Sequence, residues 1–222
     1  MNPIPCHPQI VQQAEASTLA SKEDRALLRL LLDRSVQNTD AERVADELID
    51  RFGGLGDIVA AEVVELVRIR GLGPTAILDF KLVRELSVRL TRSTACERPV
   101  LSSWSALLAY VRVALAHLPR EQFRALYLDR RNILLRDELV ADGSVDHAPV
   151  YPREVIRRAL ELSASALILV HNHPSGDPSP SQADISMTRQ VMDAARVFSL
   201  QVHDHIIVGR EGTASFRALG LI

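Results

Sequence analysis

Two histidines that could bind a metal follow a short apolar stretch in the second half of the chain. Residues 166–170 are continuously apolar and rich in branched side chains, which predicts a strand buried on both faces. His171 and His173 come directly after it, and because side chains alternate along an extended chain, their imidazoles project to the same side. Two imidazoles that converge on one point are suitable zinc ligands.

A carboxylate follows at a spacing that lets it join the histidines. Three prolines and one glycine in residues 174–180 stop both strand and helix, which predicts a stiff loop. Ser181 is a good N-cap residue, and Asp184 falls in the first turn of the helix predicted after it. Two histidines and one carboxylate leave a fourth tetrahedral position open, which is typical of a catalytic zinc site. The alternative is a strand-to-helix loop whose histidines bond only to the backbone.

The complete spacing resembles a known signature. His-x-His, seven residues, Ser, two residues and Asp is the pattern of the JAMM (MPN+) metalloprotease fold. The segment His-Asn-His-Pro-Ser-Gly-Asp-Pro-Ser-Pro-Ser at 171–181, with Asp-His-Ile-Ile-Val-Gly at 204–209, is similar to the RadC family within that fold. The resemblance implies an α/β/α domain with a mostly antiparallel sheet flanked by helices. It also implies a Zn²⁺ ion on His171, His173 and Asp184 and hydrolysis of a peptide or isopeptide bond.

The resemblance further implies a glutamate near the start of the first strand, acting as base toward a zinc-bound water whose pKa is lowered to ~7. Glu121 is the matching residue, although the family's glutamate usually stands one residue nearer the strand, where this chain has Gln122. Glu138 and Glu154 are the alternatives. Ser181 would donate a hydrogen bond to the developing oxyanion, in addition to capping its helix.

A second histidine cluster, residues 203–205, lies in another predicted strand, 200–208. Because the family motif includes Asp204 and His205, we expect one of them to support the metal ligands from behind. A purely structural role is the alternative for both.

The N-terminal half contains a motif that could bind DNA. Gly71-Leu72-Gly73 between two helical patterns resembles a helix-hairpin-helix, in which the glycines permit a tight turn and the leucine points inward. Amides at the start of the following helix, with Arg70 and Lys81, would bind DNA phosphates without reading sequence. The alternative is a hairpin that joins two helices and binds nothing.

These patterns predict two domains. We expect a flexible tail over 1–20, a small all-α helix-hairpin-helix domain over 21–90, a linker over 91–99 and the JAMM/MPN-like α/β domain over 100–222. Before the metal-site strand, the second domain should contain a helix and three strands in a meander, at 123–129, 133–140 and 145–151.

Composition limits the class of protein. The 222 residues carry a formal net charge of −2, which argues against a protein that coats nucleic acid indiscriminately. Two cysteines, Cys6 and Cys96, make a disulfide framework improbable and fit a reducing compartment. No apolar run approaches the ~20 residues that a membrane span needs. A cytoplasmic protein is expected.

Two functions therefore compete at the level of sequence. The first is a zinc-dependent hydrolase acting on an unidentified peptide or protein. The second is a DNA-associated repair or recombination factor whose zinc domain is a scaffold or a nuclease. An interaction module that has lost its metal is the least favoured, because all three ligands are present. The substrate and the oligomeric state stay open.

Overall fold

A computed structural model describes residues 23–35, 41–96, 99–143 and 150–222. The expected tail over 1–20 lies outside them. The chain divides into two compact units, Met1–Val83 and Arg84–Ile222. Among the described residues, no helix combines the length and the apolar character that crossing a membrane requires.

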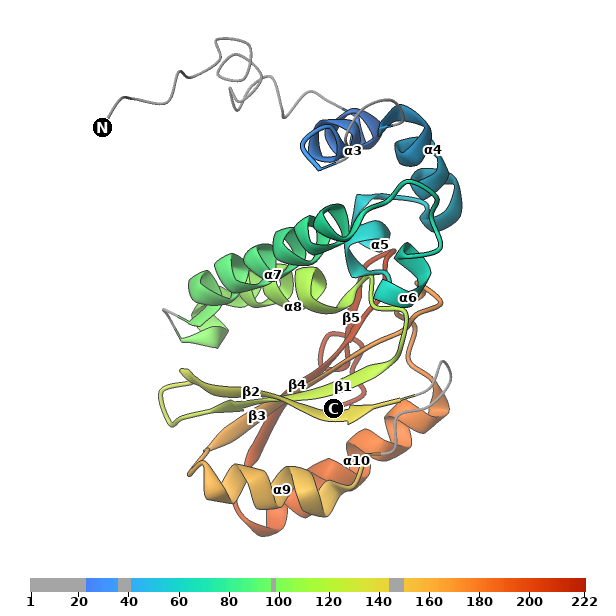
Figure 1. Cartoon of the computed structure of the whole chain (residues 1–222). Helices are drawn as coiled ribbons and strands as arrows, with labels where there is room; N and C mark the ends of the chain where they lie inside the picture. Colours follow the sequence, from blue (N-terminus) through green and yellow to red (C-terminus); the bar gives the residue numbers. More distant parts are fainter. Residues whose placement is uncertain (1–22, 36–40, 97–98, 144–149) are drawn as a thin grey trace, which may run out of the picture. The chain divides into compact units, whose positions relative to one another are not determined.

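The first unit is helical (Figure 1). Its helices are α3 (Asp24–Leu32), α4 (Ala41–Phe52), α5 (Leu55–Ala60), α6 (Val63–Leu66) and the first part of α7 (Pro74–Cys96). The apolar side chains that repeat at three and four residues along them form one core, in which Leu28, Leu48, Leu66 and Phe80 are fully buried.

The helix α7 is longer than the sequence pattern indicates. Residues 91–96, expected to begin the linker, form its last turns. They lack an apolar rhythm, but the hydroxyls of Thr91, Ser93 and Thr94 donate to carbonyls one turn earlier in the same helix. Ala95 is buried against the core of the second unit. The hydroxyl groups of this polar stretch are thus satisfied within the helix, and one buried methyl group anchors it.

The second unit is built on a five-stranded sheet (Figure 1). Its strands are β1 (Gln122–Leu128), β2 (Leu134–Asp142), β3 (Ala166–Asn172), β4 (Gln201–Val208) and β5 (Thr213–Ser215), in the order β2-β1-β3-β4-β5. Only the β3–β4 pair is parallel among these neighbours, so the expectation of a mostly antiparallel sheet is confirmed. Of the expected strand over 145–151, residues 145–149 lie outside the described residues, and Tyr151 is the N-cap of the next helix.

Helices cover both faces of this sheet. The 3₁₀ turn η1 (Val100–Ser103) leads into α8 (Trp104–Leu115), which packs with Ile168 and Val170 of β3 on one face. The helices α9 (Pro152–Glu161) and α10 (Gln182–Val197) cover the other face, where Leu167 and Leu169 point. Every residue of β3 is buried, as its continuously apolar sequence predicts.

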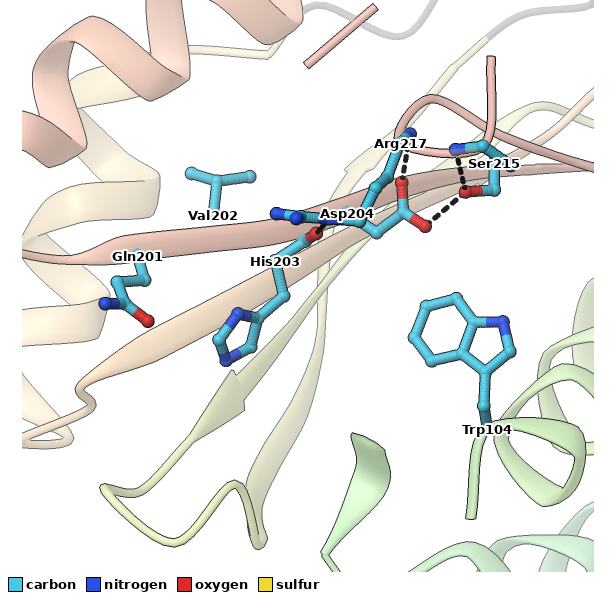
Figure 2. A pocket seen from close by; sticks show the side chains of 8 residues that line it. Trp104, Gln201, Val202, His203, Asp204, Ser215 and Arg217 are labelled. Atoms are coloured by element: carbon cyan, nitrogen blue, oxygen red, sulfur yellow. Dashed lines mark hydrogen bonds between the residues drawn. The ribbon is translucent and has the colours of Figure 1, made fainter. Parts of the chain in front are cut away.

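A hollow of about 750 Å³ lies beside β4 (Figure 2). Its wall includes Trp104, His203, Asp204 and Arg217. Asp204 is 2% exposed and accepts hydrogen bonds from Ser215 Oγ and from the backbone N–H of Arg217. The carboxylate therefore anchors the C-terminal segment to β4.

Candidate metal centre

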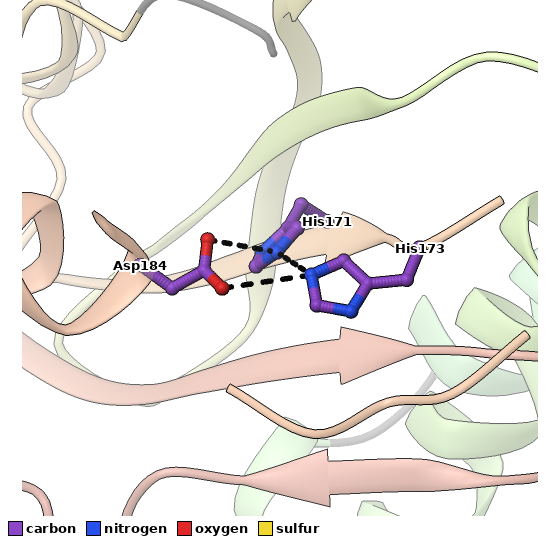
Figure 3. Close-up of side chains that lie close together, drawn as sticks. All are labelled: His171, His173 and Asp184. Atoms are coloured by element: carbon purple, nitrogen blue, oxygen red, sulfur yellow. Dashed lines mark hydrogen bonds and ion pairs between the residues drawn. The ribbon is translucent and has the colours of Figure 1, made fainter. Parts of the chain in front are cut away.

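The end of β3 and the start of α10 bring the three predicted ligands together (Figure 3). His171 is in β3, and His173 directly follows the last residue of that strand. Asp184 is in the first turn of α10. The Nε2 atoms of the two imidazoles are 3.0 Å apart. The Asp184 carboxylate lies 3.2 Å from Nε2 of His171 through Oδ1 and 3.5 Å from Nε2 of His173 through Oδ2.

The three side chains differ in access to solvent. The His171 side chain is 1% exposed, whereas those of His173 and Asp184 are 19% and 14% exposed. The group thus has a buried side, formed by the strand, and an open side that a small molecule could reach.

Charge coupling within the group shifts two pKa values. Burial alone would raise the pKa of Asp184, but the adjacent imidazoles of His171 and His173, whose protonated forms would donate to the carboxylate, hold it well below its ordinary value. The hydrogen bond with Asp184 raises the pKa of His173, against the opposing effect of burial. The site therefore keeps an ionised carboxylate that favours a cation beside it.

The loop over 174–180 orients His173. The Nδ1–H of His173 donates to the carbonyl of Asp177 at 2.8 Å, which leaves Nε2 as the lone-pair nitrogen facing His171. Gly176 has a φ of +101° and turns the loop back on itself. Arg210 donates to the carbonyls of Pro174 and Ser175, so the segment after β4 holds this loop in place.

Ser181 and Asp184 form a capping box at the start of α10. The Ser181 hydroxyl accepts from the backbone N–H of Asp184 at 3.1 Å and donates to Oδ2 of that residue at 2.6 Å. The capping bond uses a lone pair and leaves the proton for a second bond, which Asp184 now receives. Oδ2 also accepts from the Ser181 N–H at 2.7 Å, so Oδ1 is the less engaged oxygen of the carboxylate.

Glu121 lies beside this group at the entrance to β1. In the antiparallel pairing of β1 with β3, Phe123 faces His171, which places the chain two residues earlier next to His173. The Glu121 carboxylate is close enough to contribute to the raised pKa of His173. The alternatives are engaged elsewhere, because Glu138 pairs with Arg158 of α9 and Glu154 pairs with Arg157.

Asn172 was not singled out from sequence, although it stands between the two histidines. It is fully buried and bonds to the backbone on both sides of Glu121. Its Oδ1 accepts from the N–H of Gln122 at 2.8 Å, and its Nδ2 donates to the carbonyl of Arg120 at 3.0 Å. One amide thus ties the segment that carries the expected base to the strand that carries the expected ligands.

The second histidine cluster splits between two places. His205 is fully buried behind the candidate ligands, with its Nε2 2.8 Å from Nδ1 of His171, and burial lowers its pKa well below the ordinary value. Its other nitrogen contacts Thr188 of α10, a residue that sequence reasoning missed. Asp204 points to the hollow beside β4 and is not brought to the candidate ligands.

The predicted hairpin forms between α6 and α7. Gly71 has a φ of +91°, and Leu72 is 8% exposed within the core of the first unit, as the motif predicts. Arg70 is exposed, and its carbonyl accepts a hydrogen bond from Arg43. The Lys81 ammonium donates to the carbonyls of Val59 and Ala61. Lys81 is thus bound to the protein's own backbone, whereas the turn around Gly73 is open, since a Cβ added there would meet nothing within 4 Å.

Comparison with known proteins points to one family. The family model described as "RadC-like JAB domain" matches residues 101–221, which cover the sheet and the candidate metal ligands. A protein of Rhodobacter capsulatus named "UPF0758 protein" is 53% identical over 199 residues, or 90% of this chain and 93% of that protein. The similarity to that relative therefore extends over both units.

Proposed function

The chain belongs to the RadC family, with a JAB domain over its second unit, and on that premise we propose that it is a zinc-dependent hydrolase of peptide or isopeptide bonds. The observation that carries the proposal is the convergence of two imidazole nitrogens and one ionised carboxylate on a point with an open side. Three protein ligands with free access are what a hydrolytic zinc site needs. A cytoplasmic location belongs to the same proposal.

The donor set fits zinc. Nε2 of His173 presents a lone pair, because Nδ1 of that ring donates to Asp177, and the nearest atoms it faces are Nε2 of His171 and Oδ2 of Asp184. Several acceptor atoms that face one another over 3.0–3.5 Å attract a cation. Nitrogen and carboxylate donors in this number suit Zn²⁺. When bound, zinc would supply a Lewis acid and lower the pKa of a water molecule there to about 7.

The chain's own residues supply the remaining roles. Glu121, at the edge of the group, would accept a proton from the attacking water and transfer it to the leaving nitrogen. The Ser181 hydroxyl would donate to the oxygen of the scissile carbonyl, provided that it releases Oδ2 of Asp184, to which it now donates. Its N-cap bond can persist meanwhile, because that bond uses a lone pair.

Zinc content per chain is the first test. We expect one zinc per wild-type chain by elemental analysis after loading with zinc and desalting. The double variant His171→Ala/His173→Ala and the single variant Asp184→Ala should retain little, because each removes a ligand. A folded wild-type chain that binds no zinc would overturn the proposal.

Hydrolysis is the second test, on a panel of peptide and isopeptide substrates. Glu121→Gln should keep the zinc and lose about 10²–10⁴-fold in rate, because it removes only the group that moves the proton. Glu138→Gln and Glu154→Gln are matched controls and should keep the wild-type rate, since both carboxylates pair with arginines. Equal losses in all three variants would contradict the role of Glu121.

DNA binding by the hairpin is the second candidate function. The positive φ of Gly71, the buried Leu72 and the open surface at Gly73 favour it. We propose that any such contact is made by backbone amides and Arg70, since Lys81 is engaged with the carbonyls of Val59 and Ala61. Salt-dependent binding to duplex DNA that weakens in Arg70→Ala and not in Lys81→Ala would support it.

A further inference from the structure

A chain of buried hydrogen bonds runs from α10 through β4 to the metal ligand His171. The Thr188 hydroxyl lies 2.6 Å from the carbonyl oxygen of Asp184 and 2.6 Å from Nδ1 of His205. Nε2 of His205 lies 2.8 Å from Nδ1 of His171. Thr188, His205 and His171 are all fully buried, so no solvent competes for these bonds.

The donors in this chain follow from its first bond. A carbonyl oxygen only accepts, so the single hydroxyl proton of Thr188 is directed at Asp184. The hydroxyl must then accept from His205, which places a proton on Nδ1 of that ring. In the neutral ring the opposite nitrogen, Nε2, is the acceptor, and His171 donates to it from Nδ1. Nε2 of His171 is thereby left with a lone pair, facing His173 and Asp184.

A second placement of the protons keeps the hydrogen bond between the two imidazoles equally well, but it would block metal binding. With the proton of His205 on Nε2, that ring would donate to Nδ1 of His171, whose own proton would move to Nε2. Nδ1 of His205 would then need a donor, and Thr188 could supply one only by giving up the carbonyl of Asp184. The contact between Thr188 and this carbonyl therefore selects between the two arrangements.

We propose that Thr188 and His205 are positioning residues that fix the proton of His171 on Nδ1, so that Nε2 is always available as a metal ligand. The inference rests on the proposed function, because it assigns a purpose to that lone pair. Asp177 does the same for His173 through its backbone carbonyl. Each imidazole is thus held in its ligating form by a partner on the side away from the metal.

Aromatic packing keeps the two rings from reorienting. Phe123 stacks on His171 at 5.8 Å between centroids with an interplanar angle of 17°, and its edge contacts His205 at 5.5 Å. Phe216 also packs against His205, with 4.5 Å between the ring centroids. Rotation of either imidazole would displace a buried phenyl ring. The two arrangements therefore differ only in which nitrogens carry the protons, and not in the orientation of the rings.

The test compares Thr188→Val, which replaces the hydroxyl with a methyl group, with Thr188→Ser, which keeps the hydroxyl. Long-range ¹H–¹⁵N correlation spectra of the metal-free proteins report which nitrogen of each imidazole carries the proton. We expect the Nδ1–H form of His171 in the wild type and in Thr188→Ser. In Thr188→Val the Nε2–H form should become populated, because an unpaired buried N–H on His205 is unfavourable.

Zinc affinity, measured by competition with a chromogenic chelator, is the second readout. Thr188→Val should bind about 10–100-fold more weakly than the wild type, and Thr188→Ser should be close to it. If Thr188→Val does not fold by circular dichroism, Thr188→Ala is measured in its place. An Nε2–H form of His171 in the metal-free wild type, or a Thr188→Val variant with unchanged spectra and affinity, would overturn the proposal.

The two proposals fail in different ways. The spectra are recorded without metal, so they test the proton arrangement even if the wild type proves to bind no zinc. Zinc binding with the wrong tautomer would overturn only the positioning role of Thr188 and His205, and leave the hydrolase proposal in place.

Discussion

Asn172 controls the distance between the expected base and the expected ligands. Its amide bonds to the N–H of Gln122 and to the carbonyl of Arg120, the residues on either side of Glu121. Because the neighbours of Asn172 in the chain are both candidate ligands, a shift of this amide would change the position of Glu121 relative to the candidate metal site.

We therefore expect Asn172→Ala to keep one zinc per chain and to lose about 10²-fold in hydrolysis, the cost of misplacing a reacting group by about 1 Å. It should also lower the free energy of unfolding by about 1–3 kcal/mol, because two backbone groups lose their partner. Elemental analysis, kinetics and urea unfolding check the three parts. Loss of the zinc together with the activity would show that Asn172 acts through the histidines instead.

His203 should make stability depend on pH. Burial lowers its pKa, and Arg217, its charged neighbour in the C-terminal segment, lowers it further, while its Nε2–H donates to the neutral amide of Asn132. The unfolded chain then binds the proton more readily than the folded protein. The contribution of His203 to the free energy of unfolding should fall as pH decreases through the ordinary histidine pKa of about 6.5, and level off below the lowered folded-state pKa.

Urea unfolding of the wild type and His203→Gln between pH 8 and pH 4.5 isolates this contribution. The difference between the two free energies should change in favour of the variant as pH falls. A constant difference across this range would show that His203 titrates alike in the folded and unfolded chain.

Residue type and spacing were enough to predict that the three candidate ligands come together, because His171, His173 and Asp184 lie within fourteen residues along one strand, loop and helix start. Local rules for strands, prolines and caps place such a segment. The supports of the site were not predictable in this way. Thr188 and Asn172 act through bonds to β4 and to the start of β1, and those partners depend on the order and register of the strands.

At the scale of elements, the loop over 174–180 depends on a close approach to the segment after β4. A Cβ on Gly209 would lie 2.1 Å from the carbonyl oxygen of Gly176 and 3.1 Å from the nitrogen of Pro178. Both are backbone atoms, so the loop itself would have to move. The same loop carries the Asp177 carbonyl that orients His173.

Gly209→Ala should lower the free energy of unfolding by about 1–3 kcal/mol and weaken zinc binding, because it displaces this loop. Gly212→Ala is the matched control three residues later, where a Cβ would meet nothing within 4 Å. Urea unfolding and zinc titration of the two variants decide the matter. Equal stability of both would mean that the loop moves aside without cost.

The helix α7 shows where periodicity misleads. Its polar end has no apolar rhythm, which predicts a linker, but the helix continues to Cys96, with its hydroxyl groups bonded to its own carbonyls and Ala95 buried. The strands were easier to predict, since β3 is apolar throughout and β1 alternates before it becomes fully buried. A strand buried on both faces has a continuous run of apolar residues, whereas a solvated helix end has no such pattern.

At the scale of the whole molecule, the two units have separate cores. The buried cluster of the first unit is made of residues between Leu28 and Phe80, and the two clusters that line the sheet begin at Ala95 and at Phe123. All the candidate ligands and their supports belong to the second unit. A ligand stabilises the cooperative unit that binds it, so zinc should act on the two units unequally.

Hydrogen exchange of the full chain, followed by mass spectrometry with and without zinc, tests this. We expect slower exchange in β3, β4 and α10 when zinc is present, and unchanged exchange in α3, α4 and α5, because their protection depends on a core that does not contain the site. The variant His171→Ala/His173→Ala should show no zinc effect in either unit. Equal slowing in both units of the wild type would show that they unfold together, with the continuous helix α7 as the element that couples them.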